Sequence, residues 1–506
     1  APNTYSPIKH LEKARERQSY VLERMVKEAY ITPAEADHAK KTVISIHPMK
    51  KVNSEQSAYF LEHLRIQLEE KYGEEQLYKG GLKIYTTMSA EMQRAAFDSI
   101  RSGLKAVDKR QGFRGPVHVT AATADLLGVM LPDSAFIQEK DAEWAREREA
   151  RRGRRHAGDE SNEEPLYTIK DAHEALRLLE PVGYGTVFSP APGITACFRD
   201  AGHILGSSIV EIWIERGGGS KPFKLVCSGD LGQPGRPVLP DPTPIAEADA
   251  LIVESTYGNR LHKTLAETYD EFSAVLSRVL PRGNVVIPAF AVGRTQEVLH
   301  VLADLAKQGR VPSLNVFVDS PLATAATAIT MKYAHTLDRE SRDLAAWQSR
   351  HPDRMRVRFT ETPDDSKAIN AIRSGAVIIA ASGMCEAGRV RHHLRHSLPR
   401  EECAVVFTGF QASGTLGRAL VDGAKSVRLF REEVPVRASV HTIGGLSAHG
   451  DQAALLGWLA GFRQAPRRTF VVHGERETQQ GFAALVAQRL GWPSVEAPER
   501  GLRVLL

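Results

Sequence analysis

Four short segments of the chain place histidine and carboxylate side chains directly after, or beside, runs of β-branched residues. Open α/β sheets build their sites at such positions, because the loops at strand ends converge there. Neutral imidazoles and carboxylates together bind divalent metal ions, and a pair of such ions activates water for hydrolysis. One histidine after a strand is more often a core residue, but four such segments favour a metal-dependent hydrolase. The segments are Asp-Ala-Gly-His-Ile-Leu-Gly-Ser at 200–207, Ser-Gly-Asp-Leu-Gly at 228–232, Leu-Ser-Ala-His-Gly-Asp at 446–451 and Val-Val-His-Gly-Glu at 471–475.

The elements that must position these segments begin at about residue 116. From there, short β-branched runs alternate with helical stretches, which is typical of an α/β protein. Upstream, residues 9–40 favour helices, and Thr32-Pro33 marks a helix start with proline in the first turn. The expected strands are 117–120, 209–214, 225–227, 250–253, 284–287, 315–318, 376–380, 404–407 and 469–472.

The composition excludes several classes of protein. The 506 residues carry 66 Lys+Arg against 61 Asp+Glu, and 42% are apolar, so collagen-like and disordered chains are excluded. The four cysteines form no Cys-x-x-Cys pair, which argues against a disulfide framework and a zinc knuckle. No window approaches 18 consecutive apolar residues and the first residues do not resemble a signal peptide. We therefore expect a cytoplasmic chain without a membrane segment.

Residues from about 112 to 506 resemble the metallo-β-lactamase-fold RNA hydrolases of the β-CASP family. The resemblance rests on the four segments above, on Val-Glu-Ser-Thr-Tyr-Gly at 253–258, and on five further strings. The further strings are Pro-Ala-Phe-Ala-Val-Gly-Arg-Thr-Gln-Glu at 288–297, Asp-Ser-Pro-Leu-Ala at 319–323, Ala-Ser-Gly-Met-Cys at 381–385, Gly-Arg-Val-Arg-His-His-Leu at 388–394 and Gly-Phe-Gln-Ala-Ser-Gly-Thr-Leu-Gly-Arg at 409–418.

The resemblance implies a role for five residues. His203 matches a ligand of the family's third metal motif, and Asp230 matches the bridging aspartate of the fourth. Glu254 is the acidic residue of motif A. The histidine of motif B, His449, is thought to help protonate the leaving oxygen, and that of motif C, His473, ligates metal. The implied metal ligands are therefore His203, Asp230 and His473, with Asp230, Glu254 and His449 as the catalytic set.

The implied reaction is the attack of metal-activated water on an RNA phosphodiester, with two zinc ions as cofactor. Arg294 and Ser382 are candidate phosphate contacts, although a structural ion pair is an equal interpretation for Arg294. His392 and His393 fit a helix near the cleft with a contact to RNA better than a metal cluster with His396. Bacterial members tend to dimerise, so a homodimer is compatible with the resemblance. A preference for DNA, and endonucleolytic or exonucleolytic cutting, stay open.

The expected fold is α/β, an incomplete αββα metallo-β-lactamase sandwich with an inserted β-CASP α/β domain, preceded by a mostly helical foreign segment. Its incompleteness follows from one absence. The family's His-x-His-x-Asp-His motif should lie upstream of residue 112, but no His-x-His occurs in the sequence, so four of seven expected ligands are missing. The expected domains are 1–45 and 46–115 for the foreign segment, 116–257 and 411–506 for the sandwich, and 258–410 for β-CASP.

Residues 1–116 resemble instead a fragment of a class A penicillin-binding protein, from the end of its glycosyltransferase domain into the connector. The matching strings are Pro-Asn-Thr-Tyr-Ser-Pro at 2–7, Arg-Gln-Ser-Tyr-Val-Leu-Glu-Arg-Met at 17–25, Leu-Tyr-Lys-Gly-Gly-Leu-Lys-Ile-Tyr-Thr-Thr at 77–87 and Asp-Lys-Arg-Gln-Gly-Phe-Arg-Gly-Pro at 108–116. The chain is therefore expected to be a fusion at residues 112–116. Two alternatives to an RNA hydrolase follow: a catalytically silent RNA-binding scaffold, and, less favoured, a fragment acting in peptidoglycan synthesis.

Overall fold

The computed structural model describes residues 11–42, 68, 71–72, 76, 115–151, 165–409, 411–412, 414–499 and 501–504. Two compact units divide the chain between Arg114 and Gly115, where the two sequence resemblances meet. The predicted connector at 46–115 lies almost wholly outside the described residues. No helix within these ranges is both long and apolar enough to cross a membrane.

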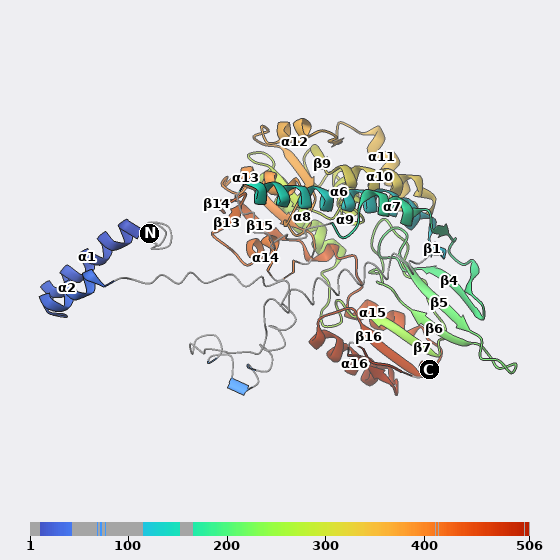
Figure 1. The fold of residues 1–506 in the computed structure, drawn as a ribbon. Coiled ribbons are helices and arrows are strands. Elements are labelled where there is room, and N and C mark those ends of the chain that lie inside the picture. Colours follow the sequence, from blue (N-terminus) through green and yellow to red (C-terminus); the bar gives the residue numbers. More distant parts are fainter. Residues whose placement is uncertain are drawn as a thin grey trace. The chain divides into compact units, whose positions relative to one another are not determined.

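The described part of the first unit contains a helical hairpin, drawn in blue in Figure 1. It consists of α1 (Leu11–Lys27) and α2 (Pro33–Lys41), which confirms the helices predicted over 9–40. The Thr32 hydroxyl caps α2 and the Glu35 carboxylate accepts the Thr32 backbone N–H, forming a capping box. Since α1 buries none of its residues, this hairpin has little core of its own.

A seven-stranded mixed sheet forms the base of the second unit, in the order β17-β16-β7-β6-β5-β4-β3. The strands from β3 to β6 pair antiparallel, whereas β6, β7, β16 and β17 run parallel. Parallel neighbours end at one edge of the sheet, and this edge carries the polar segments singled out in the sequence. The strands are β3 (Val187–Ala191), β4 (Ile194–Asp200), β5 (Ser208–Ile214), β6 (Phe223–Cys227), β7 (Ala250–Glu254), β16 (Arg468–Val472) and β17 (Val495–Glu496).

A six-stranded parallel sheet, in the order β10-β9-β11-β8-β12-β15, forms the inserted domain. Its central strands, β9, β11, β8 and β12, are mostly apolar and buried on both faces, as parallel sheets require, whereas the edge strands β10 and β15 are partly exposed. Val285 and Ile287 face the core under α8 (Leu265–Val279) and α9 (Arg294–Lys307), and the intervening Val286 faces the core under α13 (Val390–Ser397). The strands are β8 (Val285–Pro288), β9 (Leu314–Asp319), β10 (Met355–Phe359), β11 (Ala376–Ala380), β12 (Ala404–Phe407) and β15 (Ser439–Thr442).

Helices cover these sheets, and several begin with a serine, threonine or aspartate cap. Helices α8 to α14 belong to the inserted domain and α15 and α16 pack on the seven-stranded sheet (Figure 1). They are α8 (Leu265–Val279), α9 (Arg294–Lys307), α10 (Pro321–Lys332), α11 (Arg339–Arg350), α12 (Pro363–Ile369), α13 (Val390–Ser397), α14 (Leu416–Val421), α15 (Gln452–Ala460) and α16 (Arg476–Leu490). Two short 3₁₀ turns are η1 (Ala334–Thr336) and η2 (Gly444–Leu446). A small antiparallel hairpin consists of β13 (Ser426–Leu429) and β14 (Glu432–Pro435).

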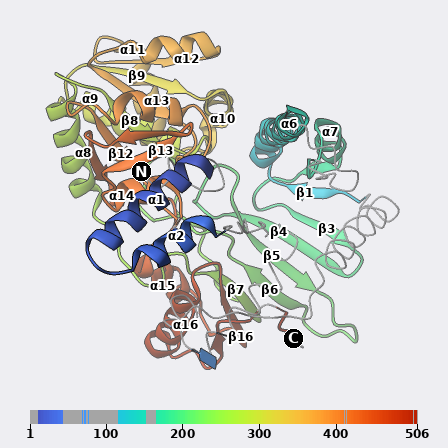
Figure 2. The ribbon, with the colours of Figure 1, turned by 60° about the vertical axis from the view of Figure 1, so that its left-hand side comes forward.

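The second sheet expected of a sandwich is reduced, among the described residues, to one parallel pair. This pair is β1 (Val117–Val119) with β2 (Leu179–Pro181), followed in space by α6 (Ala121–Arg151) and α7 (Ile169–Leu176). Figure 2 shows α6 and α7 beside β1, and the His118 ring of β1 lies 4.6 Å from that of Phe188 on β3. Phe136 and Ile137 of α6 are half exposed. This exposed apolar surface is in keeping with a sandwich that lacks part of one layer.

The described architecture is mixed α/β and fits a metallo-β-lactamase fold with a β-CASP insert. One predicted boundary shifts. The insert was expected to end at 410, but β15 at Ser439–Thr442 pairs with β12 and therefore belongs to the six-stranded sheet. The chain returns to the seven-stranded sheet only through α15 and β16.

Candidate metal and phosphodiester site

Five predicted residues from five separate segments meet at one edge of the seven-stranded sheet. Asp230 follows β6, Glu254 ends β7 and His473 follows β16, and these three strands are parallel neighbours. His203 comes from the loop between β4 and β5, and His449 from the loop between η2 and α15. The convergence follows from topology, because adjacent parallel strands bring their carboxyl ends together.

The Asp230 carboxylate lies between two imidazoles. Its Oδ1 is 3.1 Å from Nδ1 of His473 and its Oδ2 is 3.8 Å from Nε2 of His203. One potential ligand atom from each of Asp230, Glu254, His449 and His473 lies within 4.8 Å of the others. The rings of His203 and His449 are stacked at a tilt, with centroids 4.3 Å apart.

Glu254 holds His449 in place. The Glu254 carboxylate is 1% exposed, accepts the backbone N–H of Leu231 at 2.6 Å and that of Thr256 at 3.2 Å, and lies 3.2 Å from Nδ1 of His449. Although burial alone would raise it, the hydrogen bond and charge of His449 hold the pKa of Glu254 below its usual value. Burial lowers the pKa of His449, but the hydrogen bond and charge of Glu254 outweigh burial, so the pKa of this imidazole is raised above its usual value. The pair therefore favours a carboxylate with an imidazolium.

A close backbone approach joins two of the loops. A Cβ on Gly232 would lie 1.9 Å from the carbonyl oxygen of Gly202, so a larger residue would push the His203 loop away from the Asp230 loop. The Gly232 N–H donates to the carbonyl of Ala201 at 2.8 Å, and Gly232 also forms a β-bridge with His449. Glycine at this position thus lets three segments of the site pack directly on one another.

The donor atoms around Asp230 are close enough to share one divalent ion. The group whose ligand atoms all lie within 4.8 Å of one another is Asp230, Glu254, His449 and His473, and His203 adds a further imidazole 3.8 Å from Asp230. Ligand atoms around a tetrahedral zinc lie roughly 3.3 Å apart, given bonds of about 2 Å. The separations of 3.1 and 3.8 Å around Asp230 are close to that value. Burial, and then the charge of His449, lower the pKa of His203, which keeps this imidazole neutral as a ligand must be. In the described part of the chain no second group of three or more metal-competent side chains occurs.

The predicted contacts on the inserted domain have different environments. Arg294 pairs with Glu297 at 2.6 Å and is 10% exposed, so the ion-pair interpretation holds for this residue. The Ser382 hydroxyl donates to the carbonyl of Ala387 at 3.2 Å and is partly open to solvent. His392 is exposed, and its ring lies 4.4 Å from that of Phe430.

The prediction that His393 contacts RNA is wrong. Its side chain is fully buried, with Nδ1 2.9 Å from Oδ1 of Asn370 and Nε2 2.6 Å from Oδ2 of Asp319. Helix α13 presents its buried face to the sheet at this residue, while the neighbouring His392 lies on the exposed face. Adjacent helical residues point about 100° apart, and the sequence did not reveal which one faces inward.

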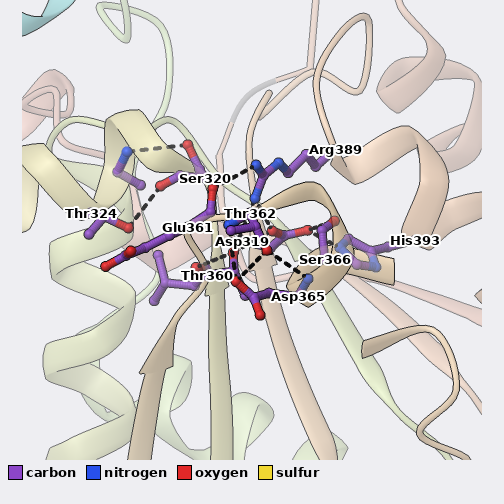
Figure 3. Close-up of polar contacts among 12 residues, drawn as sticks. Asp319, Ser320, Thr324, Thr360, Glu361, Thr362, Asp365, Ser366, Arg389 and His393 are labelled. Carbon is purple, nitrogen blue, oxygen red and sulfur yellow. Dashed lines mark hydrogen bonds and ion pairs between the residues drawn. The ribbon is translucent and has the colours of Figure 1, made fainter. Parts of the chain in front are cut away.

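Figure 3 shows the buried network to which His393 belongs. The Asp319 carboxylate accepts hydrogen bonds from the hydroxyls of Thr360 and Ser366 and from the Arg389 guanidinium, at 2.5, 2.6 and 2.7 Å. Burial would raise the pKa of Asp319, but His393, Ser366, Thr360 and Arg389 together hold it well below its usual value. No role was predicted for Asp319, although an acidic residue at the end of a buried, mostly apolar strand is a signal for one.

Two family models match the chain. A Beta-Casp domain matches residues 295–420, and a Zn-dependent metallo-hydrolase RNA specificity domain matches residues 433–496. The first covers most of the six-stranded sheet, and the second contains His449 and His473. These matches agree with the resemblance seen in the sequence.

Among curated proteins, the chain is 36% identical over 384 residues to ribonuclease TTHA0252 of Thermus thermophilus, covering 75% of this chain and 80% of that protein. It is 30% identical over 397 residues to the transcription termination factor FttA of Pyrococcus abyssi, covering 76% of this chain and 57% of the relative. An RNase J-like protein of Methanocaldococcus jannaschii is 32% identical over 342 residues, which is 66% of this chain and 76% of that protein.

The first relative is covered over most of its length, whereas the chain spans little more than half of the archaeal termination factor. The match to the ribonuclease, the two family models and the five converging side chains all agree. The chain belongs to the β-CASP metallo-β-lactamase family of RNA hydrolases.

Proposed function

We propose that this chain hydrolyses RNA phosphodiester bonds at a site that holds a single divalent ion between His203, Asp230 and His473. The observation that carries this proposal is the convergence of five side chains from five segments around the Asp230 carboxylate. Two imidazoles with one carboxylate form a donor set typical of zinc, so zinc is the proposed ion. With the His-x-His-x-Asp-His motif absent from the sequence, the proposal assigns one ion rather than two.

When bound, such an ion would acidify water and offset the charge of the phosphate. The protein supplies the proton for the other side of the reaction. His449, charged through its pair with Glu254, is placed to protonate the leaving oxygen. Glu254 is fixed by the two backbone N–H groups of Leu231 and Thr256, so it holds the imidazole in one orientation.

RNA is the proposed substrate because the chain matches an RNA specificity domain and relatives named as ribonucleases. Ser382 on the inserted domain is the proposed phosphate contact, with His392 on the exposed face of α13 as a second. Arg294 is left out of the proposed phosphate contacts, because its Nη1 donates to the Glu297 carboxylate and the charge of that carboxylate offsets its own. A cytoplasmic location and a homodimer belong to the same proposal.

Residues 1–116 are proposed to be a penicillin-binding-protein fragment with no part in the reaction. The division of the chain between Arg114 and Gly115 supports this, since it coincides with the changeover of the resemblance. Neither family model reaches this segment.

The test is a cleavage assay with the purified full chain and a 5′-labelled RNA, with zinc added and with the metal removed by a chelator. We expect zinc-dependent shortening of the RNA, and no shortening by the Asp230→Asn variant. RNA that is bound but stays intact at every zinc concentration would overturn the proposal and favour a silent RNA-binding scaffold.

A further inference from the structure

A small cavity of about 40 Å³ lies behind the site, between the seven-stranded sheet and the inserted domain. His203 and Ala448 line it on the side of the metal ligands, Arg236 comes from the loop between β6 and β7, and Gln296 and Thr330 come from α9 and α10. The volume is enough for about three water molecules, or for one ligand group and a water. Its wall thus includes one proposed metal ligand and three polar side chains, Arg236, Gln296 and Thr330, to which the proposed reaction gives no role.

Gln296 offers an unpartnered acceptor to this cavity. The residue is 8% exposed, and its Oε1 is buried without a hydrogen-bond partner. Its amide orientation is fixed on the other side, because Nε2 donates to the carbonyl of Ala291 at 3.2 Å and to the Thr327 hydroxyl at 2.8 Å. The Thr327 hydroxyl itself donates to the carbonyl of Ala323 at 2.7 Å, so it can only accept from Gln296. Oε1 is therefore the free atom of the amide.

Arg236 offers an unpartnered donor. Its Nη1 is buried and has no hydrogen-bond partner. The loop that carries it is pinned to the inserted domain, because the Val238 N–H donates to the Ser341 hydroxyl at 3.0 Å. Val238 has a φ of 86°, which a β-branched residue rarely adopts, so the loop is held in a strained conformation. Nδ1 of His203, which lines the same cavity, is also buried without a partner. Buried polar atoms normally find partners, and three without one among the residues that line one cavity point to a ligand.

A group that satisfies both atoms must accept a hydrogen bond from Arg236 and donate one to Gln296. A phosphate oxygen would suit the guanidinium, but it would face Oε1 of Gln296 with like partial charge. A hydroxyl group does both, since it has one donor and two acceptor positions. RNA carries such a group next to every phosphate, and it is the group that DNA lacks.

We infer that Arg236 and Gln296 form a pocket for a ribose 2′-hydroxyl beside the site, and that this pocket makes the chain prefer RNA to DNA. The inference rests on the proposed function, because it identifies the sugar of that substrate. In the free protein, water occupies the pocket, and the hydroxyl replaces it with the same hydrogen bonds. DNA has no 2′-hydroxyl, so Arg236 and Gln296 stay bonded to water or unpaired when DNA binds, and DNA binds with lower affinity.

The test compares two probes that differ only at the 2′ position, a fluorescent oligouridylate and the oligodeoxyuridylate of equal length. Binding to the full chain is measured by fluorescence anisotropy, with zinc present and in the cold, before cleavage proceeds. We expect the wild-type chain to bind the RNA about tenfold more tightly than the DNA. In Gln296→Leu we expect this ratio to fall to about one, through weaker binding of the RNA.

Gln308→Leu is the matched control, since Gln308 is an exposed glutamine at the end of the same helix and its ratio should stay that of the wild type. Arg236→Met is a second, independent variant on a partly exposed loop, in case Gln296→Leu does not fold. Loss of the Arg236 charge weakens the binding of both probes equally. Only the ratio of the RNA affinity to the DNA affinity therefore reports on the contact to the 2′-hydroxyl. Equal affinities of the wild-type chain for the two probes would overturn this inference alone. Binding of neither probe would overturn the proposed function and the inference with it.

Discussion

Each of the two large sheets carries a group of carboxylates and histidines at the ends of its strands. Asp230 and His473 are 3.1 Å apart, with side chains 38% and 56% exposed. Asp319 and His393 are 2.6 Å apart and both fully buried. Asp319 accepts hydrogen bonds from four protein side chains, whereas Asp230 contacts two imidazoles and remains open to solvent.

The contrast between the Asp230 group and the Asp319 group shows how a functional site can be told from a structural network built of the same residue types. A carboxylate whose hydrogen-bonding capacity is filled by the protein has none left for a metal ion or substrate. A partly exposed carboxylate between two imidazoles keeps that capacity. The Asp230 group is therefore assigned to chemistry and the Asp319 group to the stability of the inserted domain. A substitution in one group should leave the property assigned to the other group unchanged.

The largest expected effect is on catalysis. Asp230→Asn removes the charge that lies between His203 and His473, so cleavage of RNA should fall on the order of a thousandfold. With metal removed from both proteins, since bound zinc would itself stabilise the wild type, the melting temperature should hardly change, because the Asp230 side chain is partly exposed. Asp343→Asn, on the exposed face of α11, is the matched control and should cleave like the wild type. Wild-type cleavage by Asp230→Asn would remove Asp230 from the site.

The second effect is on stability. Asp319→Ala leaves Arg389 and His393 without their buried partner, so the free energy of unfolding should fall by about 3–5 kcal/mol. Urea denaturation of this variant and of Asp343→Ala measures the difference, and zinc content should be the same in both. If Asp319→Ala lost its zinc while keeping its stability, the two groups would have been assigned the wrong way round.

A smaller effect on catalysis is expected when the support of His449 is weakened. Glu254→Gln keeps the shape of the side chain but removes its charge, so RNA cleavage should fall by roughly 10- to 100-fold with zinc retained. Zinc analysis alongside the cleavage rate separates the two roles open to Glu254. Loss of zinc would make Glu254 a metal ligand rather than the residue that orients His449.

The smallest expected effect is on how the free energy of unfolding changes with pH. The pKa of Asp319 is depressed in the folded protein, so its contribution to stability is complete above the unfolded pKa and is lost as pH falls through the folded one. The free energy of unfolding should therefore drop by about 1 kcal/mol more in the wild type than in Asp319→Ala between roughly pH 4 and pH 3. Equal slopes for the two proteins would show that the Asp319 carboxyl does not titrate differently on folding.

The positions of the candidate site residues could be predicted better than their surroundings. His203, Asp230, His449 and His473 lie in segments that follow or flank runs of β-branched residues, and the topology of a parallel sheet brings strand ends together. Glu254 was identified through the resemblance to the family, and the role of each residue stays a prediction. Strand patterns depend on local sequence, so these positions could be found without coordinates.

What the sequence left out depends on tertiary contacts. Strand β10 (Met355–Phe359) was missed because it lies at the edge of its sheet and alternates arginine with apolar residues. The inward direction of His393, and the free atoms of Arg236 and Gln296, are set by packing between distant segments. No local pattern carries that information.

Zinc analysis of the purified full chain after exhaustive dialysis shows whether His203, Asp230 and His473 hold a metal ion. We expect about one zinc per chain in the wild type and in Asp319→Ala, and close to none in Asp230→Asn. A wild-type chain that retains no zinc would contradict the assignment of His203, Asp230 and His473 as a working metal site.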